Sequence, residues 1–189
     1  MKKIPTLFAR NHDGDKLVRD EVTPGCEWVL AGEGVATRKF DGTCCLVQGG
    51  VLYKRHELRP GKAAPPGFVE ADRDATTGKV FGWLPVGEGP EDRWHREAVS
   101  QALPPDGTYE LCGPKVQGNP EGFATHLLVR HGEKELPLCP CDFAGIKTFL
   151  AMSPGMEGVV WHHPDGRMAK IKRRDFKFCA KEYATPVAS

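Results

Sequence analysis

Residues 37–55 read TRKFDGTCCLVQGGVLYKR and contain the clearest local fold signal in the chain. Residues 43–48 and 51–55 are rich in side chains that favour strands, and Gly49-Gly50 lies between them. A glycine pair between two such runs is typical of a two-residue turn, because both turn positions need a positive φ. The stretch therefore predicts a β-hairpin shortly after Lys39. Within it, Cys44 and Cys45 should point to opposite faces of the strand.

Further strands are expected at residues 108–112, 126–130, 158–161 and 167–173, the last two joined by the turn HHPDG. Residues 91–102 predict a helix, with acids in the first turn and Pro104-Pro105 as a stop. A second short helix is expected to begin near Asp142. Residues 60–90, with their prolines, glycines and charges, predict a long irregular excursion. Because strands outnumber helices, the sequence predicts an α+β fold with antiparallel sheets and a few helices.

The composition limits the classes that remain. A length of 189 residues fits a single domain spanning residues 1–189. Lys and Arg total 26 and Asp and Glu total 25, so a polyanion site must be local and not a property of the whole surface. The 40% of hydrophobic residues excludes a mainly disordered chain, and the 22 glycines and 16 prolines argue against an all-helical bundle.

The chain also lacks the usual signals for export or membrane insertion. No apolar run approaches the roughly 20 residues that cross a bilayer, so we expect a cytoplasmic protein with no membrane partner. Seven cysteines is an odd count, which favours reduced thiols over a disulfide framework. Cys139-Pro-Cys141 and His162-His163 suggest zinc, but they lack the Cys-x2-Cys repeats of a structural site. We therefore expect buried thiols and turn histidines there.

The first candidate for catalysis is Lys39, in the pattern Lys39-x-Asp41-Gly42. A lysine is a nucleophile only when neutral, and neighbouring cations or a metal favour that form. Asp41 is placed to hold such a metal, and Gly42 lets the backbone approach a ligand closely. The alternative is a surface lysine followed by an Asp-Gly turn.

The second candidate is the basic segment that contains Lys170 and Lys172. Strand alternation puts these two lysines on one face, about 7 Å apart, with Ile171 on the other. Their ammonium groups repel each other unless an anion lies over them, and a phosphate chain is the obvious candidate. The alternative is a solvated basic strand. The other basic residues of the segment are Arg167, Arg173, Arg174 and Lys177.

Two acids and one arginine complete the candidates. Glu157 precedes the strand expected to pair with the Lys170 strand, where an oxygen ligand can recruit Mg2+ or form a salt bridge. Glu110 lies mid-strand among apolar residues, and a buried carboxylate needs a partner such as a ribose hydroxyl or a hydrated metal. Arg55 lies on the second strand of the hairpin and is placed to reach the same ligand.

Taken in order, these residues resemble the signature of the covalent nucleotidyltransferases, which comprise DNA ligases, RNA ligases and mRNA capping enzymes. The matching motifs are Lys39-x-Asp41-Gly42, Arg55, Tyr109-Glu110-Leu111-x-Gly113, Glu157-Gly158-Val159-Val160 and Lys170-Ile171-Lys172. The segments KFDGTCC, KRHELRPG, GWLPVG, YELCGPKVQGNPEG and EGVVWHHPDG resemble, more narrowly, the 5′-3′ RNA ligase family first recognised in vertebrates.

The resemblance implies a nucleotidyltransferase fold and an ATP-dependent 5′-3′ RNA ligase with a lysyl-AMP intermediate on Lys39. AMP would pass to an RNA 5′-phosphate, which a 3′-hydroxyl would then seal. It implies ATP and Mg2+ (or Mn2+) as cofactors and RNA as the partner, with no obligate protein partner. Nucleotide contacts would come from Thr37, Arg38, Gly42, Arg55, Glu110, Lys170 and Lys172, metal contacts from Glu157, Asp41 and Glu110, and RNA contacts from Arg173, Arg174 and Lys177.

Two departures from the pattern bear on the alternatives. Residues 126–130 offer only aliphatic side chains, His126 and Arg130 where related ligases carry an aromatic residue that stacks on adenine, so the preference for ATP over GTP follows from the resemblance alone. The chain ends at Ser189, so we expect no OB-fold domain after Lys172, which argues against DNA ligases and capping enzymes. A minimal DNA nick ligase, a capping-type guanylyltransferase and a non-catalytic RNA-end-binding module remain as alternatives.

Overall fold

A computed structural model describes residues 3–178 of the chain, and its contacts divide it into two compact units. Unit 1 comprises the described residues of 1–3 and 40–131, and unit 2 comprises the described residues of 4–39 and 132–189. The chain passes from one unit to the other directly after Lys39 and again after His131. The assignment of residues 1–189 to a single domain stays a prediction.

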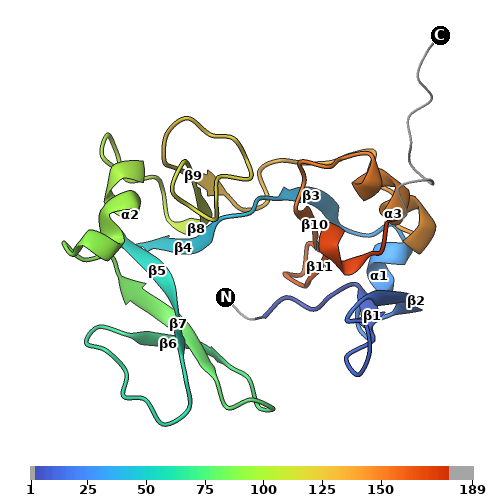
Figure 1. Ribbon diagram of the computed structural model, residues 1–189, viewed down its shortest axis with the longest axis horizontal. Coiled ribbons are helices and arrows are strands. Elements are labelled where there is room, and N and C mark those ends of the chain that lie inside the picture. The colour runs from blue at the N-terminus through green and yellow to red at the C-terminus, as the bar shows by residue number, and fades with distance from the viewer. Residues whose placement is uncertain (1–2, 179–189) are drawn as a thin grey trace. The chain divides into compact units, whose positions relative to one another are not determined.

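Unit 1 is built on a six-stranded antiparallel sheet with the order β6-β7-β5-β4-β8-β9 (Figure 1). The expected hairpin is confirmed, with Gly49 and Gly50 at φ 58° and 77° in its turn. The strands are β4 (Thr43–Gln48), β5 (Val51–Leu58), β6 (Val69–Arg73), β7 (Val80–Pro85), β8 (Gly107–Cys112) and β9 (Leu127–Arg130).

One face of this sheet is covered by a short helix, α2 (Arg93–Ala98), which follows a 3-10 turn, η1 (Pro90–Asp92). Its Trp94 and Ala98 pack against a core of sheet residues. The helix is shorter than the 91–102 predicted, because the backbone at Val99 leaves the helical region at φ −116° and ψ 14°. The buried residues of this core are Cys45, Val47, Leu52, Tyr109, Leu111 and Val116.

The prediction of an irregular excursion over residues 60–90 was wrong, because β6 and β7 form a hairpin within it. Gly82 interrupts the apolar run of β7, and a glycine inside a strand usually argues against that strand in a sequence-based prediction. The structure gives the reason for it: a Cβ at Gly82 would lie 2.3 Å from the carbonyl oxygen of Val69. The glycine allows β6 to approach β7 closely, which the sequence pattern alone does not reveal.

Unit 2 contains a three-stranded sheet with the order β11-β10-β3 and a separate two-stranded ribbon, β1-β2. The residue ranges are β1 (Phe8–Arg10), β2 (Val18–Val22), β3 (Val35–Lys39), β10 (Gly158–His162) and β11 (Met168–Lys172). The chain pairs further at both edges of the larger sheet: Leu7 donates to the carbonyl of Lys170, and Arg38 donates to the carbonyl of Lys134. The strands predicted at 158–161 and 167–173 are confirmed as β10 and β11, whereas β1, β2 and β3 were not predicted.

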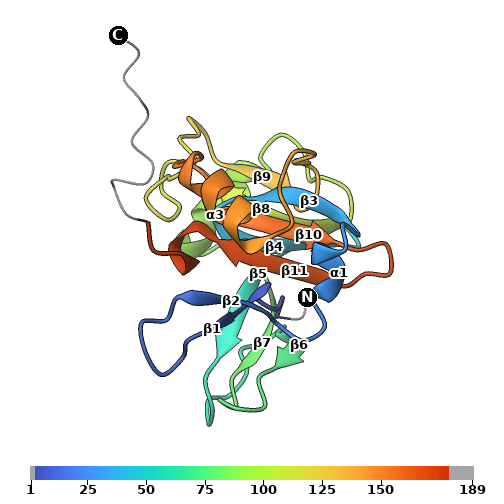
Figure 2. The same cartoon turned by 90° about the vertical axis from the view of Figure 1, so that its right-hand side faces the viewer.

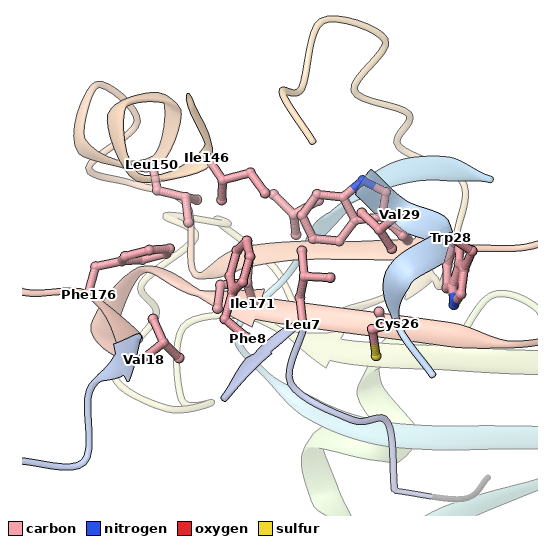
Figure 3. Packing of buried hydrophobic residues seen from close by; sticks show 13 residues of the cluster. Leu7, Phe8, Val18, Cys26, Trp28, Val29, Ile146, Leu150, Ile171 and Phe176 are labelled. Atoms are coloured by element: carbon pink, nitrogen blue, oxygen red, sulfur yellow. The ribbon is translucent and has the colours of Figure 1, made fainter. Parts of the chain in front are cut away.

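Helix α3 (Phe143–Ala151) covers one face of this sheet (Figure 2). Asp142 starts it as expected, since its carboxylate accepts a hydrogen bond from the Gly145 N–H at 2.9 Å. Figure 3 shows Ile146 and Leu150 pointing from the helix toward Leu7 and Ile171. Their buried partners in the sheet and the β1-β2 ribbon include Val159, Trp161, Ala169 and Phe8, and the short helix α1 (Glu27–Leu30) adds Trp28 and Val29.

The two units together confirm an α+β fold dominated by antiparallel sheets. The nucleotidyltransferase fold and the absence of an OB-fold domain stay predictions. Within residues 3–178, no helix is long and apolar enough to cross a membrane.

Gly158 provides a test of the unit 2 sheet. A Cβ at this position would lie 2.1 Å from the carbonyl oxygen of Ile171, which is backbone and cannot move aside alone. We expect Gly158→Ala to lower the free energy of unfolding by about 1–3 kcal/mol, seen as a fall in Tm of roughly 2–4 °C per kcal/mol. Gly155→Ala is the matched control, because a Cβ added there would have no atom within 4 Å. Equal Tm values for the two variants would contradict this account of the sheet.

Candidate active site

Two lysines meet across the sheet of unit 2. Gly158 of β10 pairs in register with Lys39 of β3 on one side and with Lys172 of β11 on the other. All three positions share a face, and the glycine has no side chain to fill the space between the lysines. The opposite face carries Val159 and Ile171 and packs against α3, so the lysines lie on the face that α3 leaves uncovered.

Glu157, directly before β10, lies between these lysines and pairs with both. Its Oε1 is 2.5 Å from Lys172 Nζ, and its Oε2 pairs with Lys39 Nζ. Burial raises the pKa of Glu157, but the two ammonium groups outweigh burial and hold the pKa below its ordinary value. Glu157 is therefore ionised at neutral pH, and the predicted salt bridge is present.

Lys170 lies on the same face, one row along the sheet from Lys172, as strand alternation predicted. Burial, together with the charges of Lys172 and Lys39, lowers the pKa of Lys170 to about 8. A lysine in this state loses its proton readily, and an anion placed over it would stabilise the charged form. The expectation of a phosphate over these lysines stays a prediction.

Thr37 and Arg38, predicted to border a nucleotide, both make contacts inside unit 2. Thr37 is 2% exposed, and its hydroxyl donates to the carbonyl of Val160 at 3.0 Å. That hydroxyl then accepts from Nε2–H of His162 at 3.1 Å, which fixes the His162 tautomer. Arg38 points to the opposite face from Lys39 and donates to the carbonyl of Gly155 at 3.0 Å. Their roles at a nucleotide stay predictions.

Glu110 lies on β8 in unit 1, 8% exposed, with two partners. Its Oε1 accepts from the Gly42 N–H at 3.1 Å, and its Oε2 is 2.8 Å from His131 Nε2. Gly42 is needed for this approach, because a Cβ there would lie 2.1 Å from the carbonyl oxygen of Leu111. The buried carboxylate therefore has its required partners within the protein.

Asp41 and Arg55 also belong to unit 1. The Asp41 N–H donates to Oε1 of Glu121 at 2.9 Å, which anchors the segment after Lys39. Arg55 lies over the ring of Phe81 at 5.1 Å, on the sheet face opposite to Lys54. Strand alternation puts Arg55 on the same face as Glu110 and Cys44, as expected.

Cys44 and Cys45 point to opposite faces, which confirms the expectation for the strand. Cys45 is fully buried in the core beneath α2, and burial raises the pKa of its thiol. Cys44 pairs in register with Glu110, and its thiol lies near that carboxylate and the His131 ring. Sequence reasoning missed His131, whose only signal was its position at the end of the strand that pairs with β8.

The three residues predicted to bind RNA follow β11 and differ in their surroundings. Arg173 donates from Nε to the carbonyl of Leu150 at 3.1 Å and lies over the ring of Phe178, so it joins this segment to the end of α3. Arg174 and Lys177 are exposed. Between them, Asp175 is buried, pairs with Arg10 and accepts from the Lys172 N–H at 2.8 Å.

The positions considered for zinc have other partners. His163 contacts Glu33 and Asp165, in the turn between β10 and β11. Burial raises the pKa of Cys139 to about 12, which disfavours the thiolate that binds metals. In the described part of the chain, the group of three potential ligands is instead Cys44, Glu110 and His131.

Comparison with known proteins agrees with the motifs. The family model described as RNA ligase 1 matches residues 97–186. RNA ligase 1 of Pongo abelii is 24% identical, in an alignment covering 77% of this chain and 68% of the relative. RNA ligase 1 of Danio rerio is 27% identical, with 73% and 66% covered. The chain resembles the RNA ligase 1 family.

This result confirms the resemblance expected from the sequence motifs. The matched segment contains Glu110, Glu157, Lys170 and Lys172, but it begins after Lys39 and Arg55. The grouping of Lys39 with Glu157 and Lys172 therefore rests on the geometry of unit 2. Similar relatives also include RNA ligase 1 of Mus musculus, at 24% identity.

Lys170 provides a pH test of this cluster. Its pKa of about 8 lies below the ordinary 10.5, so the folded protein disfavours the charged form at neutral pH. Between these two values the unfolded chain binds more protons, and stability rises with pH. We expect Lys170→Met to raise the free energy of unfolding at pH 7 by on the order of 1 kcal/mol, allowing for partial exposure. This difference in the free energy of unfolding between the variant and the wild type should shrink as pH rises from 8 toward 10.

The measurement is thermal or urea unfolding of both proteins at pH 7 and pH 10. Lys172→Met is the matched control, and it should lower the free energy of unfolding. It removes a partner of Glu157 and leaves that carboxylate poorly compensated. A Lys170→Met gain that is unchanged at pH 10 would show that the charge of Lys170 is not the cause.

Proposed function

We propose that this protein is an ATP-dependent 5′-3′ RNA ligase that forms a lysyl-AMP intermediate on Lys39. AMP would pass from Lys39 to the 5′-phosphate of an RNA end, and a 3′-hydroxyl would displace it to form the phosphodiester bond. The observation that carries the proposal is the grouping of Lys39, Glu157 and Lys172, with Lys170, on one sheet face. The similarity to proteins named RNA ligase 1 supports the choice of RNA.

The surroundings of Lys39 suit a nucleophilic amine. Glu157 compensates the charges of Lys39 and Lys172 by pairing with both. If an oxygen of Glu157 turns to another partner, Lys39 remains beside Lys172 and Lys170. Their positive charge disfavours the protonated amine and promotes the neutral, nucleophilic form.

The phosphates of ATP would take their place over Lys170 and Lys172. These two lysines would stabilise negative charge as the α-phosphorus is attacked and pyrophosphate leaves, which is the main requirement of nucleotidyl transfer. Arg55 would contact the ribose or the RNA phosphate, and Arg174 and Lys177 would attract the RNA backbone from exposed positions. Binding through such contacts weakens as salt rises.

Carboxylates are the oxygen donors that Mg2+ and Mn2+ prefer, and Glu157 fits this requirement; a metal role for Asp41, which belongs to unit 1, stays a prediction. Glu157 would hold the ion, which when bound would supply positive charge to the phosphate oxygens. Glu110 fits less well as a ligand of Mg2+, because a thiol and an imidazole are its neighbours.

The intermediate gives the first test. Incubation with α-labelled ATP and Mg2+ should label the protein, and the label should survive denaturation but be lost in acid, as expected of a P–N bond. Lys39→Ala should abolish labelling, because no other residue would provide the attacking amine. Lys134→Ala is the matched control, since Lys134 is exposed and lies in the same unit. Undiminished labelling of a correctly folded Lys39→Ala variant would refute the proposal.

The acceptor gives the second test. With ATP, we expect sealing of RNA that carries a 5′-phosphate and a 3′-hydroxyl, and much slower sealing of nicked duplex DNA. Preferential labelling from GTP would instead indicate a capping-type guanylyltransferase, and efficient DNA sealing a minimal nick ligase. RNA binding without any nucleotide-dependent label would identify a non-catalytic end-binding module. Gel separation of the nucleic-acid products distinguishes these outcomes.

A further inference from the structure

Three side chains with different metal-binding chemistry converge in unit 1. Cys44, Glu110 and His131 each offer one ligand atom, and these atoms all lie within 4.8 Å of one another. We propose that they form a binding site for a borderline-soft divalent ion, with Zn2+ as the best fit. The site lies wholly within unit 1 and shares Glu110 with the nucleotide contacts that the sequence motifs imply.

The backbone places these ligands on a rigid framework. Cys44 on β4 and Glu110 on β8 are direct partners in the antiparallel register, so their side chains project side by side from one face. His131 follows β9, the next strand, and its N–H donates to the carbonyl of Thr108 on β8 at 3.1 Å. Neighbouring strands therefore hold all three ligands, which limits the ordering that metal binding would require.

The donor set selects the metal. A thiolate, an imidazole and a carboxylate are the three protein ligand types that zinc uses, and three of them leave a fourth tetrahedral position for water. Mg2+ and Ca2+ prefer oxygen ligands only, so the sulfur and nitrogen atoms disfavour them. The site therefore differs in chemistry from the oxygen-ligand site expected at Glu157.

The surroundings of Glu110 and His131 support ligation. The Gly42 N–H holds Glu110 Oε1 at 3.1 Å, while Oε2 is directed toward His131 Nε2 at 2.8 Å. A hydrogen-bonded second carboxylate oxygen is the usual support of a ligating carboxylate. The 2.8 Å between Oε2 and Nε2 is the distance of a hydrogen bond, whereas two such ligands at about 2.0–2.1 Å from a tetrahedral zinc ion lie roughly 3.3 Å apart. Zinc would therefore take the place of the bridging proton after the two atoms separate by roughly 0.5 Å.

Zinc binding at this site releases a proton. Cys44 binds as the thiolate and gives its thiol proton to solvent. His131 binds through Nε2 as neutral imidazole, so its ring proton moves to Nδ1, which is buried and makes no hydrogen bond among residues 3–178. Nothing is oxidised or reduced. If the thiol of Cys44 and the ring of His131 are both neutral before binding, one proton is released for each ion bound.

Cobalt provides a readout independent of activity. Titration of the metal-free protein with Co2+ should produce the visible bands of a four-coordinate ion and a near-ultraviolet thiolate-to-cobalt charge-transfer band, saturating at one ion per chain. Zn2+ should abolish both bands by displacement, and an excess of Mg2+ should not. Octahedral spectra without a thiolate band in the wild-type protein would overturn the proposal.

Matched cysteine variants assign the site. Cys44→Ala should remove the thiolate band and weaken Zn2+ binding by at least about 100-fold, since second-shell changes alone cost roughly 10–100-fold. Cys45→Ala changes the adjacent residue on the other face and should keep the band, as should Cys141→Ala in unit 2. A band that survives Cys44→Ala, or that disappears in Cys141→Ala, would contradict the assignment.

His131→Asn offers a second route if Cys44→Ala does not fold, because His131 lies after the strand and is only half-buried. It should weaken Zn2+ binding to a similar degree, and circular dichroism would confirm that the variant is folded. Unchanged Zn2+ affinity in a folded His131→Asn protein would refute the site.

Discussion

Glu157 pairs with both Lys39 and Lys172 and offsets the repulsion between two ammonium groups that the unit 2 sheet brings together. The register of β10 brings two ammonium groups into one row, and without a carboxylate between them their repulsion would oppose that register. Gly158 is required at the same point, because a Cβ there would collide with β11. The pairing of β10 with β3 and β11 therefore requires both the Glu157 carboxylate and a glycine at position 158.

The opposite face of the sheet explains why Lys39 and Lys172 stay in register with Gly158. Val159, Trp161, Ala169 and Ile171 are nearly or fully buried and pack with α3, so the strands cannot shift register by one residue without exposing this core. Buried Asp175 adds a further constraint, since it pairs with Arg10 of β1 and accepts the Lys172 N–H. Hydrophobic packing on one face thus fixes the positions of the charges on the other.

Much of this arrangement could be predicted, because it follows from alternation along strands. The hairpin after Lys39, the shared face of Lys170 and Lys172 and the partnership of their strand with β10 all have local signals. The β6–β7 hairpin has no such local signal. Glycine inside a strand usually weakens it, and only the structure shows that Gly82 is needed for the close approach to Val69. The contact of Arg173 with the end of α3 is equally invisible in the sequence, so a basic residue that looked available for RNA is partly used in packing.

The two acids of the candidate site show how neighbours decide chemistry that residue type leaves open. In the sequence, Glu110 and Glu157 are alike: each lies within or beside an apolar strand, and each is a candidate for the same metal. In the fold, two ammonium groups pair with Glu157, and their positive charge keeps its carboxylate ionised. Glu110 lies beside a thiol and an imidazole, which favour a softer ion. Because the register of β8 with β4 sets the neighbours of Glu110, and that of β10 with β3 and β11 sets those of Glu157, strand pairing determines the chemistry of each carboxylate.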